Sequence, residues 1–212
     1  MGEWYEIKIR AVMGPGPQDD KKFIILNRTI WWEVDKIAYE GDGKNVKRVN
    51  EEMGLQGDSK GVHVPVGKES EDGEESVAMG TSEAARFWRI AATINYIALD
   101  RPDQQFTASV LGRSMSKPTE KSWMALKRAA RYLVKHPRMQ YVYHRTTVEE
   151  VREMVGYSDS DWAGCKGTRR RTSGGVVTWG GGALQSWRKR QGSAAVASWE
   201  ADYYAIVRLL SV

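Results

Sequence analysis

The sequence predicts an α+β protein, in which a short β and helical connection region precedes an incomplete unit of three antiparallel strands and one helix. Two patterns support this. Apolar residues recur at helical spacing between residues 82 and 136, and from Gln140 onward the spacing changes to two residues. With 212 residues, 41% of them hydrophobic, the chain is long enough to bury a core.

The first segment, residues 1–56, alternates short strands with turns before one helix. Strands are expected at 4–10, which the Gly-Pro repeat at 14–17 ends, and at 23–26 and 29–34, which form a hairpin. Val46, Val49 and Met53 then lie at helical spacing, and Gly54 is a candidate C-cap. Residues 57–80 are polar and contain several glycines, so we expect an exposed, mobile linker.

Residues 81–138 are expected to form a unit of three consecutive helices. Ser82 is the predicted cap of the first helix, and Pro102 separates it from a second helix over about 103–115. Thr119 is the predicted cap of the third, which ends near His136. The expected inward residues are Phe87, Ile90, Ala91, Ile94, Ile97, Trp123, Leu126, Ala130 and Leu133.

The last segment, residues 139–212, begins with a short strand at 141–143 and a longer one at 151–161. Two further strands, 172–178 and 183–189, flank the Gly180–Gly182 hairpin signal. A helix follows from about Trp199. Its predicted buried stripe consists of Tyr203, Ile206, Val207 and Leu210.

The charge of the chain is uneven and favours an anionic partner. The net charge is +5, and residues 151–212 carry nine Lys/Arg against five Asp/Glu, or +4. Cys165 is the single cysteine, so no internal disulfide can form, and we expect a reducing compartment, cytoplasm or nucleus. The sequence shows neither a signal peptide nor an apolar run long enough for a membrane span, so we expect no secretion and no membrane partner.

Two acids could hold a divalent metal ion. Asp159 lies at the end of the predicted 151–161 strand, and Glu200 lies in the first turn of the last helix. Carboxylates brought together from a strand and a helix offer the hard oxygen ligands that Mg²⁺ or Mn²⁺ prefers. Glu200 and Asp202 are about 200° apart around the helix, so only one can face the strand, and we expect Glu200. The alternative is structural: Glu200 favoured by the helix dipole and Asp159 forming a turn.

Two basic clusters lie at opposite ends of the predicted hairpin, Arg169-Arg170-Arg171 and Arg188-Lys189-Arg190. Such clusters can bind nucleic-acid phosphates without regard to base sequence. They can equally be the solvated ends of a hairpin.

Several motifs together resemble one known family. In order they are Tyr157-Ser158-Asp159-Ser160-Asp161-Trp162-Ala163-Gly164, then Arg170 to Gly174, then Gly181 to Trp187, then Ala197 to Tyr203. This series resembles the ribonuclease H domain of copia-type retrotransposon Pol polyproteins. Residues 81–138 resemble the segment that joins reverse transcriptase to ribonuclease H in these elements, and residues 22–56 resemble the end of the reverse transcriptase.

The resemblance implies hydrolysis of the RNA strand of an RNA–DNA hybrid by two metal ions, Mg²⁺ or Mn²⁺. Asp159 would bridge the metals and Glu200 would bind one of them. The family's later catalytic aspartate is not found in this sequence, and Asp19-Asp20 lacks the strand context of the polymerase acids. We therefore expect this chain to be inactive or to have only trace activity. The partners would be the hybrid and the remainder of a Pol polyprotein. The alternatives are a non-catalytic nucleic-acid-binding module and a degenerate transposon remnant.

Overall fold

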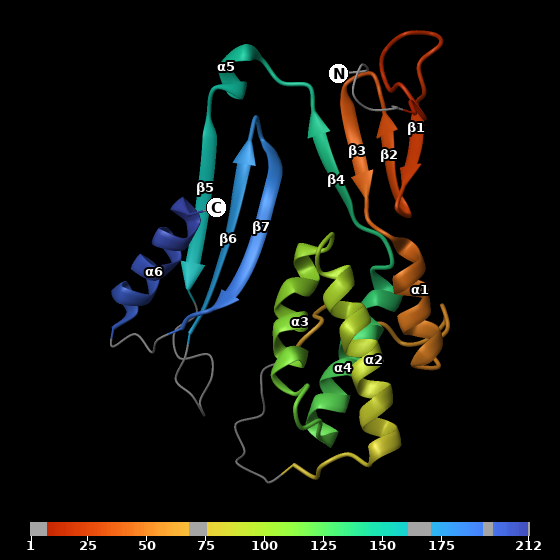
Figure 1. Ribbon diagram of the computed structural model, residues 1–212, viewed down its shortest axis with the longest axis vertical. Helices are drawn as coiled ribbons and strands as arrows, with labels where there is room; N and C mark the ends of the chain where they lie inside the picture. Colours follow the sequence, from red (N-terminus) through yellow and green to blue (C-terminus); the bar gives the residue numbers. More distant parts are fainter. Residues whose placement is uncertain (1–7, 68–75, 161–170, 193–196, 212) are drawn as a thin grey trace.

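Two antiparallel sheets lie next to each other, and a cluster of helices packs below the first (Figure 1). The computed structural model describes residues 8–67, 76–160, 171–192 and 197–211, and it confirms a mixed α+β protein. The first sheet has the order β1-β2-β3-β4 and the second β5-β6-β7. The strands are β1 (Lys22–Ile25), β2 (Arg28–Trp32), β3 (Lys36–Glu40), β4 (Gln140–His144), β5 (Met154–Ser160), β6 (Thr172–Trp179) and β7 (Gly182–Arg190).

The first sheet combines a local hairpin with a strand from far along the chain. The hairpin expected at 23–34 is confirmed as β1 and β2. Its turn residues Leu26 and Asn27 have φ of 49° and 62°, the left-handed pair that matches the twist of a tight hairpin. β4 pairs with β3 rather than with the strands that follow it. The strand expected at 4–10 lies largely outside the described residues, and residues 8–10 are not in a strand.

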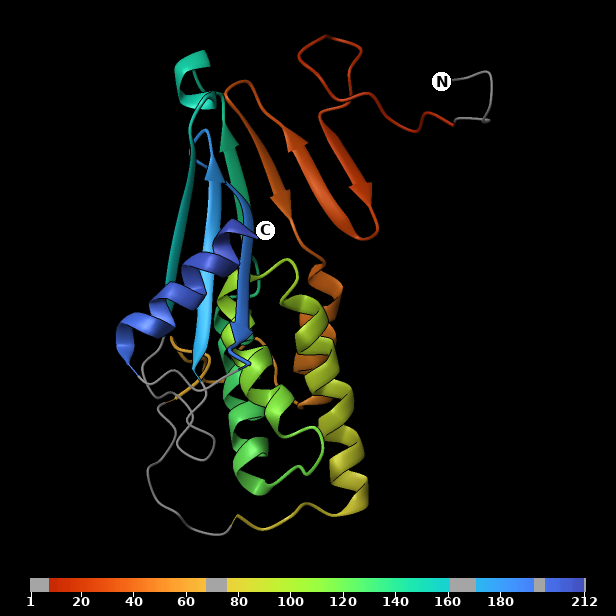
Figure 2. The same ribbon diagram turned by 60° about the vertical axis from the view of Figure 1, so that its left-hand side comes forward.

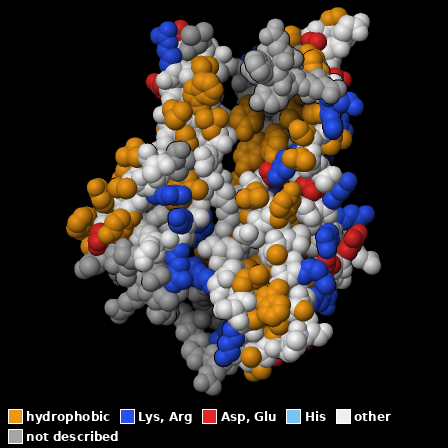
Figure 3. All heavy atoms as spheres, viewed as in Figure 1, with side chains coloured by type: hydrophobic (Ala, Val, Ile, Leu, Met, Phe, Trp, Pro, Cys, Tyr) orange, Lys and Arg blue, Asp and Glu red, His pale blue; other side chains and the backbone are white. Residues whose placement is uncertain are grey.

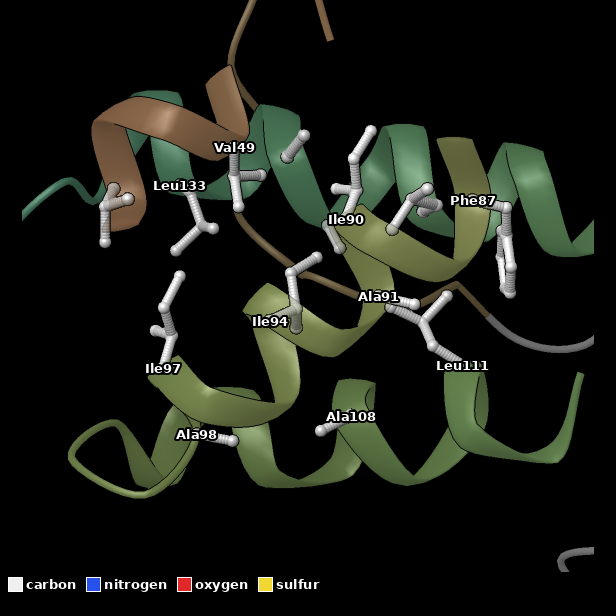
Figure 4. Close-up of a cluster of buried hydrophobic side chains, with 14 residues drawn as sticks. Val49, Phe87, Ile90, Ala91, Ile94, Ile97, Ala98, Ala108, Leu111 and Leu133 are labelled. Carbon is white, nitrogen blue, oxygen red and sulfur yellow. The ribbon is translucent and has the colours of Figure 1, made fainter. Parts of the chain in front are cut away.

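The hydrophobic core lies among α1 (Gly43–Glu52), α2 (Thr81–Ile97), α3 (Pro102–Arg113) and α4 (Glu120–Lys135), here called the helical cluster. Figure 4 shows side chains of α2 packed between α3 on one side and α1 and α4 on the other. The predicted inward residues of α2 and α4 are buried, except Trp123, which is partly buried. Thr119 caps α4 as predicted, but the Ser82 prediction is wrong, because α2 begins at Thr81 with Gly80 as its N-cap.

The predicted exposed linker is in part attached to the helical cluster. The Arg131 Nε donates to the Lys60 carbonyl at 2.6 Å, and the Val62 amide donates to the Arg131 carbonyl at 3.3 Å. Arg128 Nε likewise donates to the Val64 carbonyl at 3.1 Å. Residues 60–64 therefore lie against α4. Residues 68–75 lie outside the described residues.

One helix, α6 (Ser198–Leu210), crosses one face of the second sheet (Figure 2). The strand expected from residue 151 begins later, because Val148–Val151 form the short helix α5. The predicted buried stripe of α6 is wrong: Tyr203, Ile206, Val207 and Leu210 are all 45% or more exposed, whereas Ala201 and Ala205 are fully buried.

The reason for this reversal lies in the strand beneath the helix. A Cβ added to Gly156 would lie 2.6 Å from the Leu209 side chain, so the backbone of β5 approaches α6 closely. The helix therefore faces the sheet with Ala201, Ala205 and Leu209, which lies over the glycine, and its other large apolar side chains turn outward. Within the described ranges, no helix combines the length and apolarity needed to cross a membrane.

Candidate nucleic-acid interface

The end of β5 meets α6 through Ser160 and Asp202. Ser160 Oγ donates a hydrogen bond to Asp202 Oδ1 at 2.6 Å. Gly156, four residues earlier on the same strand, lies against Leu209 of α6. Because side chains alternate along a strand, even-numbered positions of β5 face α6, and Asp159 lies on the opposite face. The β5–β6 pairing runs without interruption through this region, so the alternation is not displaced.

Glu200 lies in the first turn of α6 and is half-buried there. Its carboxylate accepts a hydrogen bond from the Tyr204 hydroxyl at 3.0 Å, one turn along the helix. Since Ala201 and Ala205 define the buried face, the acid that reaches β5 is Asp202, two residues beyond Glu200. The structure thus brings Ser160 and Asp202 together, and the strand alternation separates Asp159 from the α6 face.

This geometry bears on whether the site could hold Mg²⁺ or Mn²⁺. A two-metal site needs several carboxylates that converge on one point. Among the described residues, no group of three or more His, Cys, Asp and Glu side chains is close enough to hold a metal ion. Asp159 lies on the face of β5 opposite α6, whereas Glu200 lies in the first turn of α6. Asp161 lies outside the described residues.

The first basic cluster is only partly described. Arg169 and Arg170 lie outside the described residues, and Arg171 is buried, with 4% of its surface exposed. The Arg171 Nη1 donates to the carbonyl of Ala197, the N-cap residue of α6, at 2.5 Å. The Arg171 guanidinium therefore holds the start of α6 inside the fold.

The second basic cluster lies at the end of β7. Arg188 places its guanidinium 3.7 Å from the centre of the Phe106 ring of α3, a cation–π contact. The register aligns Asp159, Gly174 and Arg188 across the three strands, so Asp159 and Arg188 share the face toward α3. Lys189 is exposed on the other face. Positive charge thus flanks both faces at this end of the sheet.

A group of tyrosines that the sequence analysis did not single out lies on the first sheet. Tyr39 of β3 pairs with Tyr141 of β4, and Tyr143 follows on the same face of β4. Burial, together with a hydrogen bond to Asp100, raises the pKa of Tyr39 to about 12. Burial also raises the pKa of Tyr141 and of Tyr143. The spacing of two between Tyr141 and Tyr143 could have indicated their shared face, but the pairing with Tyr39 depends on a long-range register.

Comparison with known proteins identifies the origin of the chain. The chain is 36% identical over 118 residues to the secreted RxLR effector protein 161 of Plasmopara viticola, which is 55% of this chain and 80% of that protein. It is 30% and 31% identical over 122 residues to the retrovirus-related Pol polyproteins from transposons RE2 and RE1 of Arabidopsis thaliana. These relatives support a copia-type retrotransposon Pol polyprotein fragment, at moderate identity and partial coverage.

The matches cover very different shares of the relatives. The uncharacterized mitochondrial protein AtMg00810 of Arabidopsis thaliana is 35% identical over 122 residues, which is 49% of its length. The aligned stretch is 8% of each of the RE1 and RE2 polyproteins, so this Pol segment corresponds to a small part of a much longer protein. No family model and no solved structure matches the chain.

Proposed function

We propose that this Pol-derived segment binds RNA–DNA hybrids through the basic end of β7 and does not cleave them beyond a trace. Its ancestral role is RNA-strand hydrolysis during reverse transcription, with residues 139–212 as the start of a ribonuclease H-like unit. The order of three antiparallel strands and a helix across one face supports this origin. We propose that it acts in the cytoplasm or nucleus.

The observation that carries the binding proposal is the placement of Arg188, Lys189 and Arg190 at one end of an open sheet. Consecutive strand residues point to opposite faces, so the three cations reach both sides of β7. Arg188 is held in place by the Phe106 ring, and Lys189 is exposed to solvent. Contacts of this kind bind phosphates without reading bases.

The lack of cleavage is supported by the orientation of α6, which brings Asp202 and not Glu200 into contact with β5. Catalysis by two metals depends on carboxylates that are already arranged around the ions. Here Ser160 and Asp202 occupy the contact between β5 and α6, and Asp159 lies on the face toward α3. This favours a binding module that keeps the family's strand and helix order.

Binding is tested by fluorescence anisotropy with a labelled RNA–DNA hybrid over a range of salt concentrations. We expect affinity to fall steeply with salt, because phosphate binding releases counterions. Lys189→Ala should weaken binding and reduce the slope of log K against log salt by about 1. Lys47→Ala removes another exposed lysine, from α1, and serves as the matched control, with no change expected.

The same labelled hybrid tests cleavage in Mg²⁺ or Mn²⁺. We expect intact RNA after prolonged incubation with the wild-type chain, under conditions in which the hybrid is bound. Metal-dependent cleavage that disappears in Asp159→Asn and in Glu200→Gln would instead establish a nuclease. Absence of salt-dependent binding to the hybrid would disprove the binding module.

A further inference from the structure

A cavity of about 460 Å³ lies between the two sheets. One wall consists of β2, β3 and β4, the other wall is the stretch Ala183–Ser186 of β7, and Leu99 and Asp100 in the turn after α2 also line the cavity. Figure 3 shows apolar side chains gathered in the hollow between the two lobes. We call this cavity the tyrosine groove, after Tyr39, Tyr141 and Tyr143 in its wall.

The three rings form a continuous aromatic surface. Tyr141 and Tyr143 have ring centres 6.5 Å apart and planes within 15° of each other. The Tyr39 ring lies 6.0 Å from Tyr141, at 52°. All three tyrosines are partly buried and line the cavity.

The outer two rings are held in position. The Tyr39 hydroxyl donates to Asp100 Oδ1 at 2.5 Å, and the Tyr143 hydroxyl donates to the Ala183 carbonyl at 2.9 Å. Asp100 is in turn ion-paired with Arg28 at 2.9 Å, which neutralises its charge. A wall arranged in advance loses little side-chain entropy when a ligand binds.

Polar groups that line the groove include Asp100 and Ser186. Gln105 Nε2 donates to both the carbonyl and the hydroxyl of Ser186, at 3.1 Å and 2.9 Å. Arg188 follows Ser186 on the same face of β7, about 6.6 Å further along the strand. The groove therefore suits a ligand with a flat apolar face, a polar edge and an attached anion.

We propose that the tyrosine groove binds an unpaired base of a nucleic-acid strand whose phosphates lie along the basic end of β7. A nucleobase has the required flat face and polar edge, and aromatic side chains stack on bases of any sequence. Bases in a duplex are already stacked and paired, so the groove selects single strands. The proposal rests on the proposed function for the phosphate contacts, and adds a second site for bases.

The test compares two single-stranded DNA oligonucleotides of equal length, one of thymidines only and one abasic throughout, by fluorescence anisotropy. The wild-type chain should bind the thymidine strand more tightly than the abasic one. Tyr141→Ala should weaken binding of the thymidine strand roughly 5- to 100-fold, as loss of one base stack would. Its binding of the abasic strand should not change.

Two further variants keep the result interpretable. Tyr141→Phe retains the ring and should bind the thymidine strand as the wild type does, which separates stacking from loss of fold. Tyr203→Ala removes an exposed tyrosine from α6, outside the groove, and should have no effect. Equal binding of the two strands by the wild type would overturn the groove proposal and leave hybrid binding standing. Base-dependent binding without salt-dependent hybrid binding would instead overturn the proposed function alone.

Discussion

At the scale of single residues, the ion pair of Arg101 and Asp103 connects the start of α3 to the end of α4. Arg101 is 5% exposed, and its Nε and Nη2 donate to the two Asp103 carboxylate oxygens at 2.9 Å and 2.7 Å. Nη2 also donates to the His136 carbonyl at 3.0 Å. Burial raises the pKa of Asp103, but the Arg101 guanidinium outweighs it, so the pKa of the carboxyl lies below its ordinary value of 3.8.

This lowered pKa predicts acid sensitivity. A carboxyl with a depressed folded-state pKa contributes stability that is complete above its unfolded pKa and is lost as the pH falls through the lower folded value. Asp103→Asn should therefore lower the free energy of unfolding by roughly 2 kcal/mol at neutral pH. In urea denaturation below about pH 4, it should lose stability less steeply than the wild type.

The control for this substitution is Asp58→Asn, which removes an exposed carboxylate. It should leave the pH dependence as in the wild type. A parallel pH dependence of wild type and Asp103→Asn would show that the pair does not contribute to acid sensitivity.

At the scale of elements, the packing of α6 depends on glycine in the strand beneath it. Gly156 leaves room for Leu209, and Gly175 leaves room for the Trp187 indole, which lies 2.7 Å from the position a Cβ would take. Gln191 Nε2 adds hydrogen bonds to Ser173 Oγ and to the Ala201 carbonyl, both at 2.9 Å. The small residues Ala201 and Ala205 complete the contact.

Substitution of Gly156 should therefore loosen α6. Gly156→Ala forces Leu209 or the whole helix to move, and should lower the free energy of unfolding by roughly 1–3 kcal/mol. Gly112→Ala is the matched control, because open space surrounds that position in α3. It should raise stability by up to about 1 kcal/mol through helix propensity. Equal effects of the two substitutions in urea denaturation would contradict close packing at Gly156.

At the scale of the molecule, the helical cluster and the second sheet are joined by a few contacts between α3 and β7. They include the Arg188 contact with Phe106 and the hydrogen bonds of Gln105 to Ser186. The first sheet also contacts the second, through the hydrogen bond from Tyr143 of β4 to Ala183 of β7. These contacts are polar or cation–π, whereas the main buried apolar cluster lies among α1–α4.

This junction predicts that the cooperativity of unfolding depends on Phe106. The wild-type chain should unfold in one transition, seen alike by far-UV circular dichroism and tryptophan fluorescence. In Phe106→Ala the two probes should give separate midpoints, because the second sheet loses its contact with α3. Phe23→Ala, a partly buried phenylalanine of β1, should lower stability without separating them. Coincident transitions in Phe106→Ala would show that the junction lies elsewhere.

The sequence by itself determined the features that depend on neighbouring residues. Helical spacing located α1, α2 and α4 with their buried residues, and the Asn27 turn located the first hairpin. The order of motifs around Asp159 and Glu200 identified the Pol family. These signals are local, because helix periodicity, turn conformation and motif order each involve a short stretch of chain.

Only the tertiary structure decided which surfaces meet. β4 pairs with β3 from 100 positions earlier in the chain, and this register places Tyr39 beside Tyr141. Likewise, α6 faces the sheet with Ala201 rather than with Tyr203. Each outcome depends on strand register or on the space above a glycine in another element, and neither is encoded in the periodicity of the segment itself. For the same reason the placement of Asp159 relative to α6 follows from packing and not from the motif that contains it.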